Sequence, residues 1–174
     1  MSLRNMSLCA LCLALGAAFV ACTQLPVQQP AEPTPSAAQL IASIHAAGTS
    51  DDSVVRVKPL REPGVEALLS RAHHQIDAGQ YEDAAATLDE ALKLSPKAPD
   101  ILQQRAELAV RLGDYREAGK LARRSYQLGP KVGALCARNW QTVLEMRRIV
   151  DDAAGVEAAR KAVATCEEGG PVRM

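Results

Sequence analysis

Apolar residues between positions 65 and 132 follow the helical period in four successive segments, and the whole pattern recurs after 34 residues. The recurrence includes the residues that punctuate the segments: Gly79, Tyr81, Ala84 and Pro96 return in the same order as Gly113, Tyr115, Ala118 and Pro130. A period of about this length, built from two helical segments and a turn, marks a helix-turn-helix solenoid. We therefore predict an all-α chain of stacked helical hairpins.

The first repeat is expected to run from about residue 65 to 98 and the second from about 99 to 132. In the first, a leading helix reaches a turn at 77–80, and a second helix follows over 82–94. Gly79 lies where a left-handed backbone ends a helix, and Gly113 takes the same place in the second repeat. Pro96 stops the second helix and leads into the next unit.

The third unit is degenerate. Trp140, Val143 and Leu144 fit a leading helix, but they come about four residues later than a period of 34 would place them. Asp151 and Asp152 stand in place of the Gly-Asp turn, and residues 154–166 supply the second helix. We predict two clear repeats and a degenerate third, forming a domain over 64–168 with a tail over 169–174.

The N-terminus has the features of an export signal. Arg4 precedes an apolar run over residues 6–20, which suits a secretory signal and is short for a membrane span. Residues 19–22, Phe-Val-Ala-Cys, resemble the lipobox of bacterial lipoproteins, which implies removal of residues 1–21 and lipidation of Cys22. The alternative is an ordinary cleaved signal that leaves a free cysteine. Thr23 is not the Asp that marks inner-membrane retention, so the resemblance implies an outer-membrane anchor facing the periplasm.

Residues 22–63 are rich in Pro, Gln, Ala and Ser, a composition that buries too little apolar area to order itself alone. We interpret them as a tether with a root-mean-square span of roughly 36 Å. Within it, Leu40, Ile41 and Ile44 share one helical face, and residues 53–60 alternate loosely between apolar and polar. Either these pieces fold back onto the solenoid as a cap, or they bind a partner.

After loss of the signal and lipidation of Cys22, two cysteines remain, in an oxidising compartment. Residue 151, in the predicted third turn, is equally distant along the chain from Cys136 and Cys166, so an antiparallel hairpin places the two sulfurs side by side. A disulfide there would contribute about 3 to 4 kcal/mol through the unfolded state. The alternative is two buried free thiols.

The 34-residue pattern and its Gly, Tyr, Ala and Pro positions resemble the tetratricopeptide repeat family. The resemblance implies a concave surface, lined by the leading helices, that binds another protein. Taken repeat position by repeat position, it selects as groove residues Leu69, His73, Ile76 and Asp77, then Gln103, Glu107, Val110 and Arg111, and finally Gln141, Glu145 and Arg148.

No residue pattern indicates catalysis, a cofactor or a metal site. His73 and His74 are adjacent, so on a helix they point in different directions and cannot chelate one ion. The chain has neither a glycine-rich phosphate loop nor a nucleophile elbow. The mature chain has 19 cations and 20 anions, which gives no indication of a nucleic-acid partner. We expect a protein that is not an enzyme.

Charge is nevertheless unevenly distributed. Residues 65–98 carry a net charge of −3, from six acids and three bases, and residues 99–132 carry +3, from four acids and seven bases. This polarity would orient a partner. Arg116, Lys120, Arg123 and Arg124 follow helical spacing on an outward helix, where we expect a solvated face.

The lipobox, the tether and the third unit, with its Ala137-Arg138-Asn139-Trp140 sequence, together resemble small tetratricopeptide lipoproteins, among them the LpoP-type activators of bifunctional peptidoglycan synthases. That resemblance implies a class A penicillin-binding protein as the partner. The alternative is a scaffold or assembly factor for an outer-membrane protein, pilus or secretion complex. A carbohydrate-binding module is disfavoured, because Trp140 is the only tryptophan.

Overall fold

The computed structural model describes residues 34–49 and 60–167, and this part of the chain is entirely helical. Its helices are α1 (Ala37–Ala47), α2 (Pro63–Asp77), α3 (Tyr81–Leu94), α4 (Pro99–Arg111), α5 (Tyr115–Leu128), α6 (Ala134–Ile149) and α7 (Ala153–Glu167). The predicted all-α class is confirmed. None of these helices is both long enough and apolar enough to cross a membrane.

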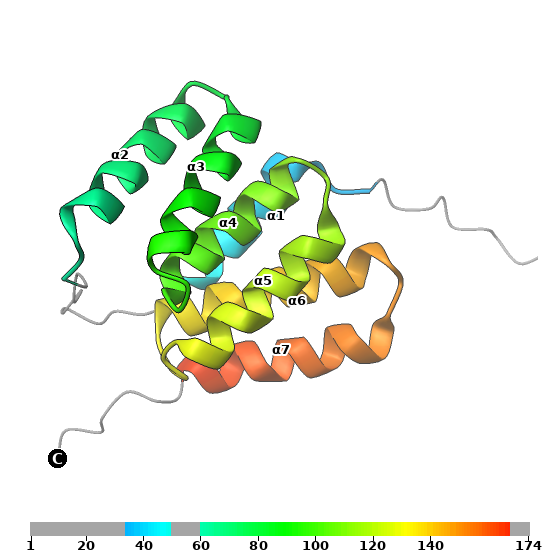
Figure 1. The fold of residues 1–174 in the computed structure, drawn as a ribbon. Helices are drawn as coiled ribbons and strands as arrows, with labels where there is room; N and C mark the ends of the chain where they lie inside the picture. The colour runs from blue at the N-terminus through cyan, green and yellow to red at the C-terminus, as the bar shows by residue number, and fades with distance from the viewer. Residues whose placement is uncertain (1–33, 50–59, 168–174) are drawn as a thin grey trace, which may run out of the picture. The chain divides into compact units, whose positions relative to one another are not determined.

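Helices α2 to α7 form three antiparallel hairpins, α2 with α3, α4 with α5 and α6 with α7 (Figure 1). Each hairpin packs on the next, because α3 contacts α4 and α5 contacts α6. The first two hairpins begin within a residue or two of the predicted positions. The third confirms the degenerate unit: α6 begins 35 residues after α4, but its turn at Asp151 comes 38 residues after Gly113, four more than the repeat period.

The turns inside the hairpins explain the spacing of the glycines. Gly79 and Gly113 have φ angles of 74° and 77°, a left-handed conformation that a Cβ atom disfavours. In the third hairpin Asp151 takes that position with a φ of 53°. Asp is among the few residues that tolerate it. The third turn therefore keeps its geometry without glycine.

Small side chains fill the places where helices cross. Ala72, Ala84, Ala118 and Ala122 have no exposed surface, and each lies in a core shared by neighbouring helices. Alanine at these positions lets helix backbones approach closely. The array therefore reaches a dense core with few aromatic residues.

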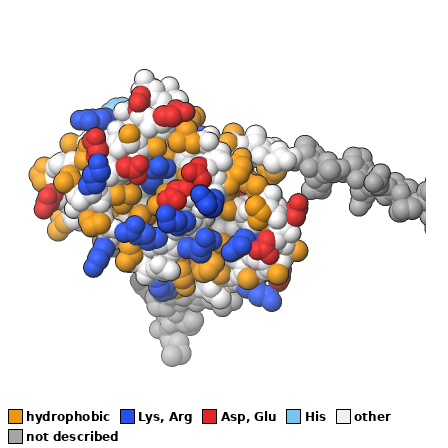
Figure 2. Space-filling view, turned by 45° about the vertical axis from the view of Figure 1, so that its right-hand side comes forward, with side chains coloured by type: hydrophobic (Ala, Val, Ile, Leu, Met, Phe, Trp, Pro, Cys, Tyr) orange, Lys and Arg blue, Asp and Glu red, His pale blue; other side chains and the backbone are white. Residues whose placement is uncertain are grey.

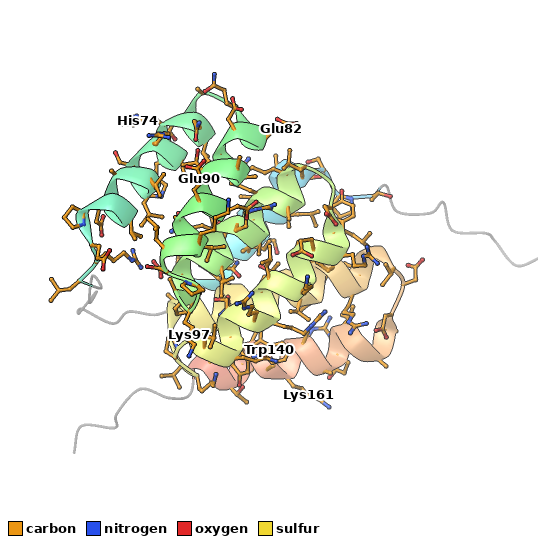
Figure 3. All side chains as sticks on the ribbon, in the orientation of Figure 1. His74, Glu82, Glu90, Lys97, Trp140 and Lys161 are labelled. Atoms are coloured by element: carbon orange, nitrogen blue, oxygen red, sulfur yellow. A yellow bond between two sulfur atoms is a disulfide. The ribbon has the colours of Figure 1, made fainter. Side chains whose placement is uncertain are left out.

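The predicted disulfide is present between Cys136, near the start of α6, and Cys166, near the end of α7, with the two Cα atoms 5.6 Å apart. Trp140 is half-buried beside this bridge, between the α5 and α7 sides of the array (Figure 3). Its ring centroid lies 4.9 Å from that of Tyr126. The bridge ties α6 to α7 within the last hairpin, and the aromatic pair packs that hairpin against α5.

Helix α1 packs against α4 and α6 (Figure 1). It begins at a capping box, in which Ser36 and Gln39 satisfy each other's backbone amides. Leu40, Ile41 and Ile44 are buried, as their shared face predicted. Of the two interpretations of residues 36–60, folding back onto the repeats is confirmed for α1. Most of the 53–60 segment, the signal over 1–21, Cys22 and the tail over 169–174 lie outside the described residues.

Candidate partner-binding groove

Helix α1 lies in the groove formed by the leading helices and covers its α4 and α6 part. It runs antiparallel to α6: Gly48, at its C-terminal end, lies beside Arg138 and the carbonyl of Ala134 at the start of α6, and Ser43 lies farther along α6. Val110 of α4 and Met146 of α6 pack with the three buried aliphatic residues of α1. The chain itself therefore occupies part of the surface on which we expected a partner.

Beside α1 the groove stays open as a cavity of about 330 Å³. Its walls come from α1, α2, α4 and α6, and the lining residues are His45, His73, Ile76, Gln104, Glu107, Leu108, Arg111 and Arg138. Four of the predicted groove residues, His73, Ile76, Glu107 and Arg111, are among them. Ile76 and Leu108 supply apolar wall, and the other side chains supply polar groups.

Glu107 is the electrostatic centre of the groove. Its carboxylate accepts hydrogen bonds from Gln103 at 2.9 Å, from His45 at 2.9 Å and from Arg138 at 2.5 Å. Burial alone would raise the pKa of this carboxyl. The hydrogen bonds from His45 and Gln103 and the charge of Arg138 outweigh burial and lower the pKa of Glu107 below its ordinary value. The carboxylate is therefore held in its charged form.

A second buried carboxylate lies farther along α6. Glu145 is 1% exposed and accepts hydrogen bonds from Ser43 of α1 at 2.6 Å and from Gln141 at 2.7 Å. Arg148 contacts its other oxygen at 3.0 Å. This part of the floor beneath α1 is therefore polar and fully paired.

Arg111 is the most available cation of the cavity. Its guanidinium lies 5.1 Å from the ring centroid of Tyr81 and 3.5 Å from the tyrosine hydroxyl, and no carboxylate of the described residues forms a salt bridge with it. His73 pairs with Gln104 at 2.9 Å on the other wall. The open part of the groove thus offers an apolar wall with a cation at its edge.

The remaining predicted groove residues lie in different surroundings. Leu69 is in the core of the first hairpin, and Asp77 is exposed at the end of α2. Val110 is buried beneath α1, and Arg148 is exposed beside Glu145. Sequence reasoning missed Ser43, His45, Gln104 and Arg138; for Ser43 and His45 the only signal was the amphipathic pattern of residues 36–47.

Among the described residues, no group of three or more His, Cys, Asp or Glu side chains is placed to hold a metal ion. His74 lies on the outer side of α2, away from the other hairpins (Figure 3). His45 and His73 are the two histidines that reach the cavity, where each is engaged by a side chain of α4.

The model of the tetratricopeptide repeat family matches residues 75–138. The solved structure of the globular C-terminal domain of P. aeruginosa LpoP is 30% identical, with a TM-score of 0.55, and the match covers 60% of this chain and 99% of that domain. This chain belongs to the tetratricopeptide repeat family. No match is found among curated proteins.

Within this tetratricopeptide repeat array the second helices face outward. Arg116, Lys120, Arg123 and Arg124 of α5 are all exposed. Figure 2 shows Lys and Arg side chains gathered on the side of the molecule that carries α5. Lys120 pairs with Glu117 at 3.2 Å, and Arg124 donates to the carbonyl of Pro96 at 3.2 Å. This outer face is charged and solvated. The groove, in contrast, is concave and has an apolar wall and a polar floor.

Proposed function

We propose that this protein is a lipid-anchored periplasmic factor that activates a class A penicillin-binding protein by direct contact. The observation that carries the proposal is the 30% identity to the LpoP globular domain across 99% of that domain. Tetratricopeptide arrays act by binding other proteins through their groove. The synthase carries out the reaction, and the repeat domain contributes contact alone.

The N-terminal sequence supports the location. A lipid on Cys22 would hold the chain at the outer membrane, and the Pro-rich segment that follows it would span the distance to a synthase in the inner membrane. A chain of about 12 residues between Cys22 and the first described residue, pulled straight, reaches roughly 40 Å. Residues 50–59 add further length if α1 leaves the groove. A tether of this kind lets the repeat domain stand clear of the outer membrane, as contact with a target at the cell wall requires.

The test is an assay of the cognate bifunctional synthase with the mature chain carrying Cys22→Ser, which removes the acylation site. We expect the chain to bind the synthase and to raise its glycosyltransferase and transpeptidase rates several-fold. Absence of both binding and stimulation would remove the activator proposal. Binding to an outer-membrane assembly component instead would favour the scaffold alternative.

A matched pair of variants assigns the contact to the groove. Arg111→Ala removes the available cation of the cavity, whereas Lys161→Ala removes an exposed cation on α7 (Figure 3). Loss of one well-placed charged contact weakens binding by about tenfold. We expect that loss for Arg111→Ala and no change for Lys161→Ala.

A further inference from the structure

The part of the groove that α1 covers has the properties of a surface that is also exposed to water. Two carboxylates in contact with α1 are at most 8% exposed: Glu107, which bonds to His45, and Glu145, which bonds to Ser43. Charged side chains are rarely placed under a permanently docked helix, because their burial costs free energy. The apolar contact of α1 comes from Leu40, Ile41 and Ile44, with Ala47 at its end packed beside the disulfide.

Release of α1 would leave neither carboxylate without a partner. Glu107 would keep Gln103 and Arg138, and Glu145 would keep Gln141 and Arg148. These four donors come from α4 and α6 themselves, so water has only to replace Ser43 and His45. An uncompensated buried charge, which is the usual cost of breaking such contacts, does not arise.

Two of the hairpin cores contain no residue of α1. They are the core of the first hairpin and the core between α4, α5, α6 and α7. Only the cluster around Val110 and Met146 includes Leu40, Ile41 and Ile44. Helix α1 itself has 11 residues, which is too short for a stable isolated helix in water. It is therefore helical because it is docked, whereas two of the repeat cores are built without it.

The geometry points to α1 as a displaceable internal competitor: the face of α4 and α6 beneath it accepts an amphipathic helix from the protein partner. The partner helix has the chemistry that α1 shows, aliphatic residues at positions i, i+1 and i+4 and hydroxyl or cationic donors that reach Glu145 and Glu107. This inference rests on the proposed function only in taking the partner to be a protein. A segment of the same chain has a high effective concentration, so α1 lowers the apparent affinity of the partner.

The experiment uses a fluorescent peptide of residues 34–49 as the probe and needs no synthase. Its binding is measured by anisotropy to the mature Cys22→Ser chain and to two further variants of that chain. Ile44→Asp places a charge at a fully buried position of α1, and Ala42→Asp places the same charge on the exposed face of α1. We expect the peptide to bind the Ile44→Asp chain at least tenfold more tightly than the parent chain or the Ala42→Asp chain.

Two results would overturn the inference. One is equal affinity of the peptide for the three chains, with circular dichroism showing that the Ile44→Asp chain is folded. The other is a concentration-dependent dimer of the parent chain, in which the groove takes α1 of a second copy.

If Ile44→Asp unfolds the repeats, hydrogen exchange of the parent chain tests whether α1 opens separately from the repeats. The amides of α1 are expected to exchange at least tenfold faster than those of α4 and α6, because α1 opens separately. Equal exchange rates in the three helices would show a single cooperative unit and would overturn the inference. These measurements do not include the synthase. A negative result would therefore overturn the inference about α1 and leave the proposed function standing.

Discussion

Ser43 donates a hydrogen bond of 2.6 Å to Glu145, a residue 102 positions away in the sequence. The bond joins α1 to the leading helix of the third hairpin. Together with the contact of His45 to Glu107 at 2.9 Å, it fixes which way α1 lies along the groove. The apolar residues of α1 hold it down, and these two polar contacts set its register.

Replacing Ser43 with Ala should loosen α1 without affecting the hairpins. Glu145 keeps its bonds from Gln141 and Arg148, so the expected cost is about 1 kcal/mol. Hydrogen exchange should show the amides of α1 exchanging about fivefold faster and those of α4 and α6 unchanged. Thr165→Ala, which removes an exposed hydroxyl bonded to the carbonyl of Ala162 in its own helix, is the control and should leave α1 exchange unchanged.

Asp151 and Asp152, although adjacent, should respond oppositely to glycine. Asp151 has a φ of 53°, which glycine adopts freely, so Asp151→Gly should stabilise the chain by about 0.5 to 1 kcal/mol. Asp152 accepts a hydrogen bond of 2.9 Å from the amide of Gly155 at the start of α7, so Asp152→Gly should destabilise it by a few tenths of a kcal/mol or more. Thermal unfolding of the two variants checks the prediction, and a shift of the same sign in both would contradict it.

The disulfide should contribute substantially to stability. It links residues 30 apart, and closing such a loop in the unfolded chain corresponds to about 3 to 4 kcal/mol. Urea unfolding of a Cys136→Ala, Cys166→Ala double variant should show that loss. Adding a reductant should lower the stability of the parent chain and leave the double variant unchanged. If the reductant lowered the stability of both chains equally, the bridge between Cys136 and Cys166 would not be the cause.

Glu107 should make the chain sensitive to acid. The pKa of its carboxyl is lowered in the folded state from an ordinary value of 4.5, so the unfolded chain binds the proton more readily. The stability that Glu107 contributes is therefore present above this ordinary value and is lost as the pH falls through the lower folded pKa. Urea unfolding at about pH 6 and about pH 3 should show a smaller loss for Glu107→Gln than for the parent chain.

Glu82, exposed at the start of α3, supplies the control for this prediction (Figure 3). Glu82→Gln should lose as much stability on acidification as the parent chain. If Glu107→Gln also behaves like the parent, the contacts of Glu107 with His45, Gln103 and Arg138 do not carry the effect.

Much of this architecture could be predicted from the sequence, because the repeat is a local property. The spacing of apolar residues predicted the helices, and Gly79 and Gly113 predicted the turns. Each of these glycines is required only by the backbone conformation at its own position. Even the third hairpin and its disulfide followed from the equal distances of Cys136 and Cys166 from residue 151.

The position of α1 could not be predicted in the same way. The pattern of Leu40, Ile41 and Ile44 shows that one face is buried but does not identify the surface that covers it. The contact between His45 and Glu107 joins residues 62 apart and depends on that docking. For this reason the groove residues were expected to be open, whereas Val110 and Glu145 are covered by α1 and Gln103 is buried between α4 and α6.

Hydrogen exchange of the mature chain with and without its synthase shows which face of the repeats the partner contacts. We predict that synthase binding slows exchange in α4 and α6 and speeds it in α1. Slowed exchange confined to the outward helices α5 and α7, with α1 unchanged, would contradict it.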